Sequence, residues 1–395
     1  MKTRFIGIAV LVLAMSLMLT SCDSMTSGGL LQELITGFWE DPEDIPEDVS
    51  EWIETIPEDW TWPETTELET TGPTPPDPEP TPSEGLEFQS NGDGTCALVG
   101  SGTCTDVDVI IPEISPDGEV VTRINVASFD TYLNMRSITI PACVTFFEID
   151  AIMYCRNLES ITVSEDNLVY HSENNCIIET ETNTLVFGCK GSKIPDGVVN
   201  IGDNAFFYCE DLTEITIPES VTHIGWNAFS DCVSLTSITI PDSVTSIETG
   251  AFAGCFGLTS ITIPASVTYI SNDAFSGCLN MKNIYVAAGN ANYMSIGNCL
   301  LQKEGNMLLA GCKNSTIPDN VTDIGERAFM GQDFMASIVI PKSVTNIEYQ
   351  AFAGCESLTD VFYTGTEEEW NAIVIGKSND DLLSATIHFN YVPES

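Results

Sequence analysis

A 23-residue repeat fills most of the second half of the sequence and limits what this chain can fold into. The strings CEDLTEITIPESVTHIGWNAF, CVSLTSITIPDSVTSIETGAF and CFGLTSITIPASVTYISNDAF begin at Cys209, Cys232 and Cys255. The same frame gives eight anchor positions: Tyr132, Cys155, Cys209, Cys232, Cys255, Cys278, Gln332 and Cys355. A unit this short cannot bury its apolar residues alone, so the units must stack into a solenoid with a shared core.

The apolar residues recur at fixed distances from each anchor. Phe stands three positions before it in all units but one, Ile or Phe stands eight before it, and Val stands eleven before it. The segment Ser237-Ile238-Thr239-Ile240 alternates polar and β-branched residues, which predicts a short strand with both isoleucines facing inward. Pro241 should end that strand, and a second extended stretch should follow over 244–247. The inward columns are therefore predicted to be structural.

The pattern L-x-x-I-x-I-P-x-x-V-x-x-I-x-x-x-A-F-x-x-C resembles the BspA-like leucine-rich repeats of bacterial surface proteins, over about residues 86–390. The resemblance implies a repeat solenoid: a β-rich, right-handed superhelix of short strands and turns, built from units of about 23 residues and capped at both ends. It assigns residues 86–120 to an N-terminal β cap, 121–362 to the repeats and 363–395 to a C-terminal cap. Two extended 54-residue units, at 155–209 and 278–332, match each other at a shift of 123 residues. Each should insert an extra coil as a strand pair.

The N-terminus has the features of an export signal. Lys2 and Arg4 precede an apolar run from Phe5 to Leu19 that is too short for a comfortable membrane span. The run ends in Leu-Thr-Ser-Cys22, which resembles a bacterial lipobox, so residues 1–22 are predicted to be a lipoprotein signal peptide with Cys22 as the lipidated residue. An ordinary secretory signal with a chance cysteine is the alternative. The resulting prediction is an extracytoplasmic protein, lipid-anchored to the bacterial cell membrane and displayed at the cell surface.

Residues 23–85 differ in composition from the rest of the chain. They contain 18 acidic residues, no Lys or Arg, and 10 of the 20 prolines, which predicts a largely disordered acidic stalk. Four of the six tryptophans, Trp39, Trp52, Trp60 and Trp62, also lie here, and a docking motif is the alternative to a plain spacer. The formal net charge of −45 argues against nucleic acid as a partner, because its phosphates would be repelled.

The sequence offers little for catalysis or metal binding. The three histidines, His171, His223 and His388, are scattered, and no C-x-x-C occurs. We therefore predict a protein that is not an enzyme and that has no cofactor or metal site. The thirteen cysteines beyond Cys22 are predicted to be free thiols, mostly on an inward column, with Cys96 and Cys104 as the least implausible disulfide pair.

The outward columns suggest where a ligand could bind. At positions nine and six before the anchors the residues vary, and they include large aromatics that have no core to fill. We therefore hypothesise a recognition face that includes His223, Trp226, Tyr269 and Tyr349; neutral variation of an exposed edge is the alternative. The family resemblance implies binding or adhesion to an extracellular protein or glycan of a host or neighbouring cell, by a monomer tethered through lipid on Cys22. A structural or spacer protein of the envelope without a specific ligand, and an accessory protein that captures polysaccharide, are the competing interpretations.

Overall fold

The computed structural model describes residues 81–125, 128–129, 132–148 and 151–393. The chain divides into two units, residues 1–79 and 80–395, and the description below concerns the second. The predicted signal peptide with Cys22, and all of the predicted stalk but residues 81–85, lie outside the described residues. The predictions made for those segments remain predictions.

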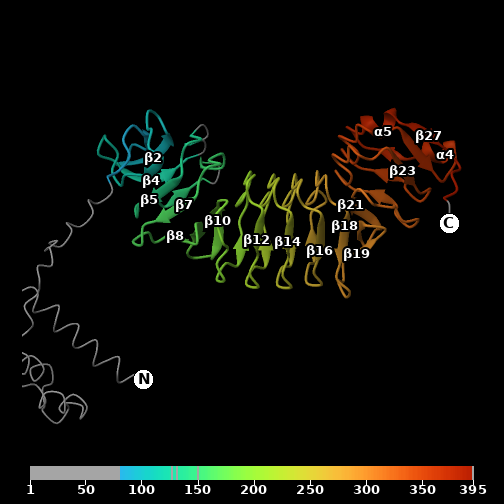
Figure 1. The fold of residues 1–395 in the computed structure, drawn as a ribbon, viewed down its shortest axis with the longest axis horizontal. Coiled ribbons are helices and arrows are strands. Elements are labelled where there is room, and N and C mark those ends of the chain that lie inside the picture. Colours follow the sequence, from blue (N-terminus) through green and yellow to red (C-terminus); the bar gives the residue numbers. More distant parts are fainter. Residues whose placement is uncertain (1–80, 126–127, 130–131, 149–150, 394–395) are drawn as a thin grey trace, which may run out of the picture. The chain divides into compact units, whose positions relative to one another are not determined.

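The body is the predicted β-solenoid. A regular coil contributes two short strands, such as β12 (Glu214–Thr216) and β13 (His223–Ile224), and each strand pairs in parallel with the matching strand of the next coil. Partners are 23 residues apart, as in Glu214 with Ser237 and His223 with Ser246. Figure 1 shows β12, β14 and β16 as neighbouring coils stacked side by side.

The second strands of the coils form three sheets together with the N-terminal hairpin and the inserted strands of the two long units. The first has the order β1 (Glu87–Ser90), β2 (Thr95–Gly100), β4 (Val120–Ile124) and β6 (Phe146–Phe147). The second is seven-stranded, with the order β17 (Tyr269–Ile270), β15 (Ser246–Ile247), β13, β11 (Asn200–Ile201), β10 (Thr184–Gly188), β9 (Cys176–Glu179) and β8 (Tyr170–Glu173). The third has the order β19 (Tyr293–Ile296), β20 (Cys299–Gln302), β21 (Met307–Ala310), β22 (Asp323–Ile324), β24 (Asn346–Ile347) and β26 (Val374–Ile375).

The first strands form shorter sheets on another side of the coils. These are β3 (Asp108–Ile110) with β5 (Ser137–Ile140) and β7 (Ser160–Val163), β12 with β14 (Ser237–Thr239), β16 (Ser260–Ile263) with β18 (Asn283–Val286), and β23 (Ser337–Ile340) with β25 (Asp360–Tyr363) and β27 (Thr386–His388). Ile238 and Ile240 are buried on this side, as the alternation predicts.

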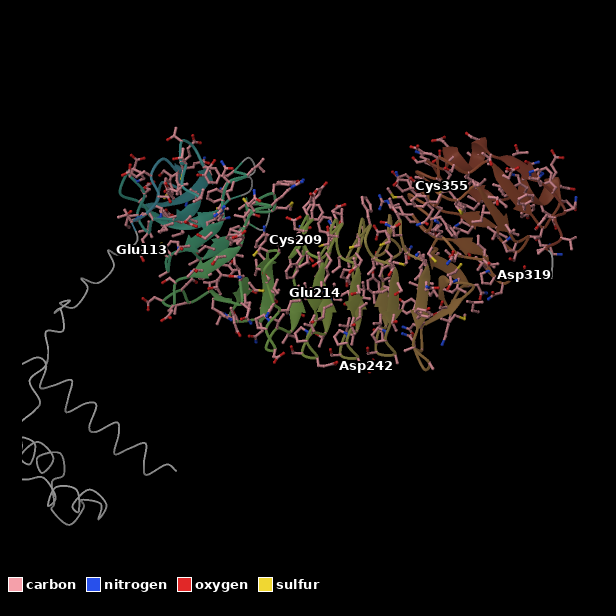
Figure 2. All side chains as sticks on the ribbon, viewed as in Figure 1. Glu113, Cys209, Glu214, Asp242, Asp319 and Cys355 are labelled. Carbon is pink, nitrogen blue, oxygen red and sulfur yellow. The ribbon has the colours of Figure 1, made fainter. Side chains whose placement is uncertain are left out.

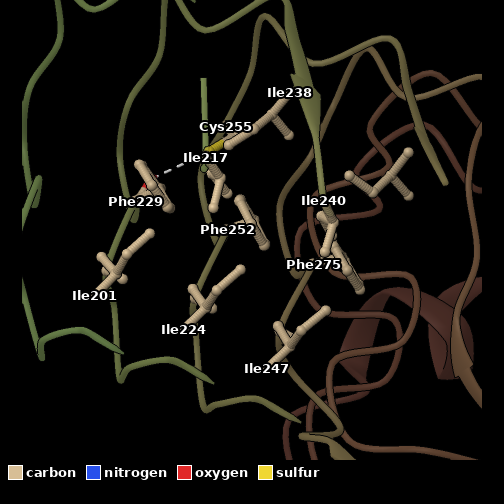
Figure 3. Close-up of a cluster of buried hydrophobic side chains, with 14 of the residues drawn as sticks. Ile201, Ile217, Ile224, Phe229, Ile238, Ile240, Ile247, Phe252, Cys255 and Phe275 are labelled. Atoms are coloured by element: carbon tan, nitrogen blue, oxygen red, sulfur yellow. Dashed lines mark hydrogen bonds between the residues drawn. The ribbon is translucent and has the colours of Figure 1, made fainter. Parts of the chain in front are cut away.

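Along each inward column, residues of the same type stack on one another in successive coils. The rings of Phe229 and Phe252 lie 5.4 Å apart and are tilted by only 5°, and Phe252 stacks on Phe275 in the same way. Figure 3 shows this row of rings beside a row of isoleucines that includes Ile224. Each anchor thiol in this run donates to a backbone carbonyl of the preceding coil, as Cys255 Sγ does to Phe229 O at 3.1 Å. Cys96 and Cys104, the disulfide pair considered from the sequence, are free thiols, and so are the anchor cysteines Cys232, Cys255 and Cys278.

The two long units interrupt this regular stacking with an antiparallel meander. The expected strand pair is β8–β9 in the first unit and β19–β20 in the second. A third strand, β10 or β21, then pairs in parallel with the second strand of the next coil. Asn167 and Asn290 are buried at the corner before each meander, where each donates to two carbonyls of the preceding coil.

Both ends of the solenoid have their own structure. β1 and β2 pair as an antiparallel hairpin at the N-terminal end. At the other end, helix α4 (Glu367–Trp370) begins with a capping box between Thr366 and Glu369, which satisfies free backbone donors. Helix α5 (Asp380–Ser384) follows, and Trp370 and Leu382 are buried against the last coils.

Candidate ligand-binding face

Two of the four predicted face residues lie on strands of the seven-stranded sheet, and a third lies in a turn directly after one of its strands. His223 and Tyr269 occupy the same outward column, with Ser246 of β15 between them. His223 Nδ1 and Ser246 Oγ share a hydrogen bond. Trp226 lies in the turn after β13, in the same coil as His223. Its side chain is 51% exposed and that of Tyr269 is 48% exposed, so both present aromatic surface to the solvent.

Tyr349 lies apart from these three residues. It follows β24 of the six-stranded sheet, and no strand pairing joins that sheet to the seven-stranded one because the second meander stands between them. Its ring also has a neighbour, since the Arg327 guanidinium carbon lies 5.7 Å from the ring centroid. The position six before the anchor looks continuous in the sequence, but the structure divides it between two sheets.

Two carboxylates that the sequence analysis did not single out lie on this face, one bonded to the Trp226 backbone and one near His223. Asp203 Oδ1 accepts a hydrogen bond of 2.8 Å from the Trp226 backbone N–H. Gly225 makes this approach possible, because a Cβ at that position would lie only 2.7 Å from Asp203 Oδ1. Glu248 stands on the next coil, with its Oε1 3.9 Å from His223 Nδ1. Asp203 could have been found from the sequence, because it precedes Trp226 by one repeat in the same column.

Four aromatic rings, all of them exposed except the half-buried Tyr208, have a Lys or Arg of the same chain close to the ring face. The cation-to-centroid distance is 4.0 Å for Arg123 over Phe146, 5.8 Å for Arg156 over Tyr208, 4.8 Å for Lys313 over Phe334 and 5.7 Å for Arg327 over Tyr349. Within the described residues, no such pair involves Trp226 or Tyr269. Trp226 and Tyr269 are about half exposed, so solvent reaches these two rings.

Other exposed aromatics are absent from the predicted face, and two of them are Tyr285 and Phe256. Tyr285 on β18 is 52% exposed and Phe256 is 40% exposed. Tyr285 pairs with Thr262 and departs from a column that is threonine in the preceding regular coils. That departure is a signal which the sequence analysis could have used. Both residues lie away from the seven-stranded sheet.

A small pocket at the first long unit gathers three thiols. Cys155, Cys189 and Cys209 line it, together with the ion pair Arg156–Glu210, whose Nη1 and Oε2 atoms are 2.6 Å apart. Burial raises the pKa of the Cys189 and Cys209 thiols. A thiol with a raised pKa is protonated at neutral pH and is a weak nucleophile and a poor metal ligand. The pocket is therefore a place where coils pack together, and its thiols are poorly suited to catalysis or metal binding.

The described residues contain neither a metal-binding cluster nor a membrane-spanning helix. In the part of the chain that the structure describes, no group of three or more His, Cys, Asp or Glu side chains could hold a metal ion. Over the same ranges, no helix is both long enough and apolar enough to cross a membrane.

The repeats match a known family. The sequence profile described as the BspA type leucine-rich repeat region matches in six copies, over residues 111–196, 188–308 and 307–374. These ranges cover more than half of the chain. The chain belongs to the BspA-type leucine-rich repeat family. The family expected from the repeat pattern is thereby confirmed.

Solved structures of other leucine-rich repeat proteins are similar to this BspA-type protein. A leucine rich cell surface protein from Faecalibacterium prausnitzii A2-165 is 25% identical, with a TM-score of 0.38, and the match covers 74% of this chain and 96% of that one. A leucine-rich repeat protein from Bacteroides ovatus is 22% identical, with a TM-score of 0.41 and coverages of 78% and 77%. A leucine-rich repeat protein from Eubacterium ventriosum is 18% identical, with a TM-score of 0.40 and coverages of 78% and 70%. No curated protein matches the sequence.

Proposed function

We propose that this BspA-type protein is a lipid-anchored cell-surface protein that binds an extracellular macromolecule through the outward face of its seven-stranded sheet. Family membership supports a role in protein interaction or adhesion. The signal-like segment that ends at Cys22 supports export and lipid anchoring. A solenoid offers a broad face and few deep clefts, which suits binding of a macromolecule better than turnover of a small substrate.

One observation carries the choice of face. Trp226 and Tyr269 are about half exposed on a sheet whose inward side is packed with identical columns. Aromatic side chains contribute strongly to binding when a partner removes them from water. Packing of the core does not require an aromatic residue at either position. Ser246 and Thr249, which are small and polar, stand at the matching positions of the neighbouring coil. The two aromatic rings are therefore available for contact with a partner.

The test is binding of the full chain to a panel of extracellular-matrix proteins, mucins and polysaccharides, at low and at physiological salt. Saturable binding to one component that persists at physiological salt is the expected result. Replacing both Trp226 and Tyr269 by Ala should weaken that binding by about thirtyfold, the effect of losing a strong interface residue. Tyr285→Ala is the matched control, because it removes an equally exposed aromatic ring from another sheet.

Each alternative predicts a different outcome. Weak binding to every component that vanishes with salt would favour a structural or spacer protein of the envelope. Preference for one polysaccharide would favour a role in polysaccharide capture. Lipid anchoring is tested separately: Cys22→Ala should abolish incorporation of a labelled fatty acid and release the protein from the membrane fraction. Retention of both label and membrane association would contradict anchoring through Cys22.

A further inference from the structure

We propose that the surface formed by Asp203, His223, Trp226, Glu248 and Tyr269, called here the Trp226 patch, binds lysine and arginine side chains of a protein partner. This inference rests on the proposed function and names the chemistry that the partner must present. It goes beyond that function because a broad adhesive face could equally recognise neutral sugars or apolar surface.

The first argument is how this scaffold already uses its exposed rings. Phe146 and Tyr349 occupy the columns nine and six before an anchor, and each has an arginine of this chain beside its ring, at 4.0 and 5.7 Å. A cation within about 6 Å of a ring centroid is attracted by the electron-rich face of the ring. Tyr269 and Trp226 occupy the same two columns without such a partner among the described residues. Their faces are open to a cation from another molecule.

The second argument is charge. Residues 199–204, 222–227, 245–250 and 268–273, which form this side of four successive coils, contain no Lys or Arg. They contain three carboxylates, of which Asp273 is paired with Arg327 at 3.0 Å. Neither Asp203 nor Glu248 forms an ion pair with a Lys or Arg of the described residues. The patch therefore attracts positive charge. A cation seated on Trp226 would have the Asp203 carboxylate on the preceding coil and the Glu248 carboxylate on the next coil.

The third argument is that the Asp203 carboxylate is fixed in place. Its Oδ1 accepts the Trp226 N–H, and Gly225 leaves room for it where any side chain would clash. A carboxylate that is already ordered loses little conformational freedom when a ligand binds. Other exposed rings lack this arrangement: Phe256 has Val233 and Leu279 at the matching positions of its neighbouring coils, and Tyr285 has Thr262.

A neutral glycan is the competing ligand, and charge separates the two. A sugar can stack on Trp226 and donate hydroxyl hydrogen bonds to Asp203, so it would still bind if that carboxylate became an amide. A lysine or arginine side chain gains from the negative charge itself. The isosteric substitutions Asp203→Asn and Glu248→Gln remove the charge and keep the hydrogen-bond acceptors, which makes them the decisive variants.

The experiment titrates the full chain into three fluorescent probes of similar size at physiological salt. The probes are a peptide rich in Lys and Arg, the same peptide with Glu at those positions, and a neutral oligosaccharide. The variants are Trp226→Ala and the pair Asp203→Asn with Glu248→Gln. The controls are Tyr285→Ala and the pair Glu214→Gln with Glu356→Gln, which changes the net charge by the same amount at exposed positions elsewhere. Figure 2 shows Glu214 on the strands of the central coils.

The proposal predicts saturable binding of the basic peptide only. It predicts that Trp226→Ala and the Asp203/Glu248 pair each weaken that binding about tenfold, while both controls leave it unchanged. Equal weakening by the two carboxylate pairs would show attraction to the acidic chain as a whole and would overturn the proposal. Full retention after Trp226→Ala, or preference for the oligosaccharide, would also overturn it. Glu248 is half-buried and the other substituted positions are exposed, so circular dichroism checks that each variant is folded.

The outcomes also separate this inference from the proposed function. If the chain binds a component of the extracellular panel but not the basic peptide, the adhesive function stands and the cation site is wrong. If the chain binds neither the basic peptide nor any component of the panel, both the adhesive function and the cation site are wrong.

Discussion

The regular coils from Cys209 to Cys278 and the two long units bury similar side chains, but they hold them by different means. In the regular coils each residue packs on its own copy 23 residues away, as in the near-parallel stack of Phe206, Phe229, Phe252 and Phe275. At the long units this stack ends. The ring of Phe206 packs against the backbone of Gly188, and the ring of Phe329 against Gly311, because each glycine closes a meander.

This difference predicts opposite sensitivities to substitution. In the regular coils a ring has a neighbour of its own kind, so removing atoms should be costly and the outward residues are free to vary. At the long units a ring occupies the space that a side chain would need, so adding atoms should be costly. Outside the core, the long units also depend on ion pairs that bridge the inserted meander, such as Arg156–Glu210 and Arg327–Asp273.

The largest expected effect is a loss of stability at alkaline pH in both regions. Burial raises the pKa of Cys278 in the regular run and of Cys299 in the second meander from 9.0 to about 12. A raised folded-state pKa gives stabilisation that is complete below pH 9 and is lost as pH rises toward 12, because the unfolded chain ionises first. Each such thiol should lower the free energy of unfolding by about 1.4 kcal/mol per pH unit in that window.

Urea unfolding at several values between pH 8 and 11 measures this slope. Cys278→Ala and Cys299→Ala should each reduce the slope of the unfolding free energy against pH by the contribution of one thiol, about 1.4 kcal/mol per pH unit. A free energy of unfolding that stays constant up to pH 11 would mean that these thiols are not buried as described.

The next effect is loss of a ring from the stack. Phe229→Ala removes a ring that is stacked on both sides and should cost about 3–5 kcal/mol in the free energy of unfolding. Phe229→Leu keeps most of the volume and is the conservative control. Chemical denaturation of the two variants gives the comparison. Equal and small losses would show that the stack contributes little beyond general hydrophobicity.

The glycines of the long units should show the reverse effect. A Cβ at Gly188 or Gly311 would overlap the neighbouring phenylalanine ring, so either Gly→Ala change should cost about 1–3 kcal/mol as overpacking. Gly197→Ala is the matched control, because its Cβ would meet nothing within 4 Å. Thermal or urea unfolding distinguishes them. If the three variants lose the same free energy of unfolding, close packing against the phenylalanine rings is not the reason that glycine is needed at positions 188 and 311.

The smallest effect concerns the bridging ion pairs. The Arg156 and Glu210 side chains are 47% and 32% exposed, so their pairing should contribute less than about 1 kcal/mol and should weaken with salt. A double-mutant cycle with Arg156→Ala and Glu210→Ala measures the coupling. A coupling energy that is large and independent of salt would contradict the assignment of a solvent-exposed pair.

The repeat explains why the regular coils could be predicted from sequence so fully. Phe229, Ile224 and Val221 recur at constant spacing, and a constant spacing in a stacked array means contact with the same residue type in the next coil. The long units could be aligned with each other, but that alignment does not reveal which residues of the inserted strands contact the neighbouring coils. Neither the third strand of each meander nor the approach of the Phe206 ring to Gly188 has a repeat from which it could be read.

The candidate face was predictable only in part, for a related reason. Trp226 and Tyr269 were found because large aromatics are unusual in outward columns. Tyr349 was grouped with them because a column in the sequence has no gaps, whereas the meander of the second long unit separates it into another sheet. Asp203 and Glu248 were missed because acidic residues are common throughout this chain. The repeat column places Asp203 beside Trp226, but the contact of Glu248 with His223 is seen only in the structure.

The most direct test of this account is hydrogen–deuterium exchange of the full chain with and without the partner that the binding panel identifies. Binding through the seven-stranded sheet predicts protection within residues 199–204, 222–227, 245–250 and 268–273, and little change in 213–216, 236–239 and 259–262, where the first strands lie. Protection confined to the first strands, or spread evenly over all coils, would contradict the assignment of the Trp226 patch as the binding surface.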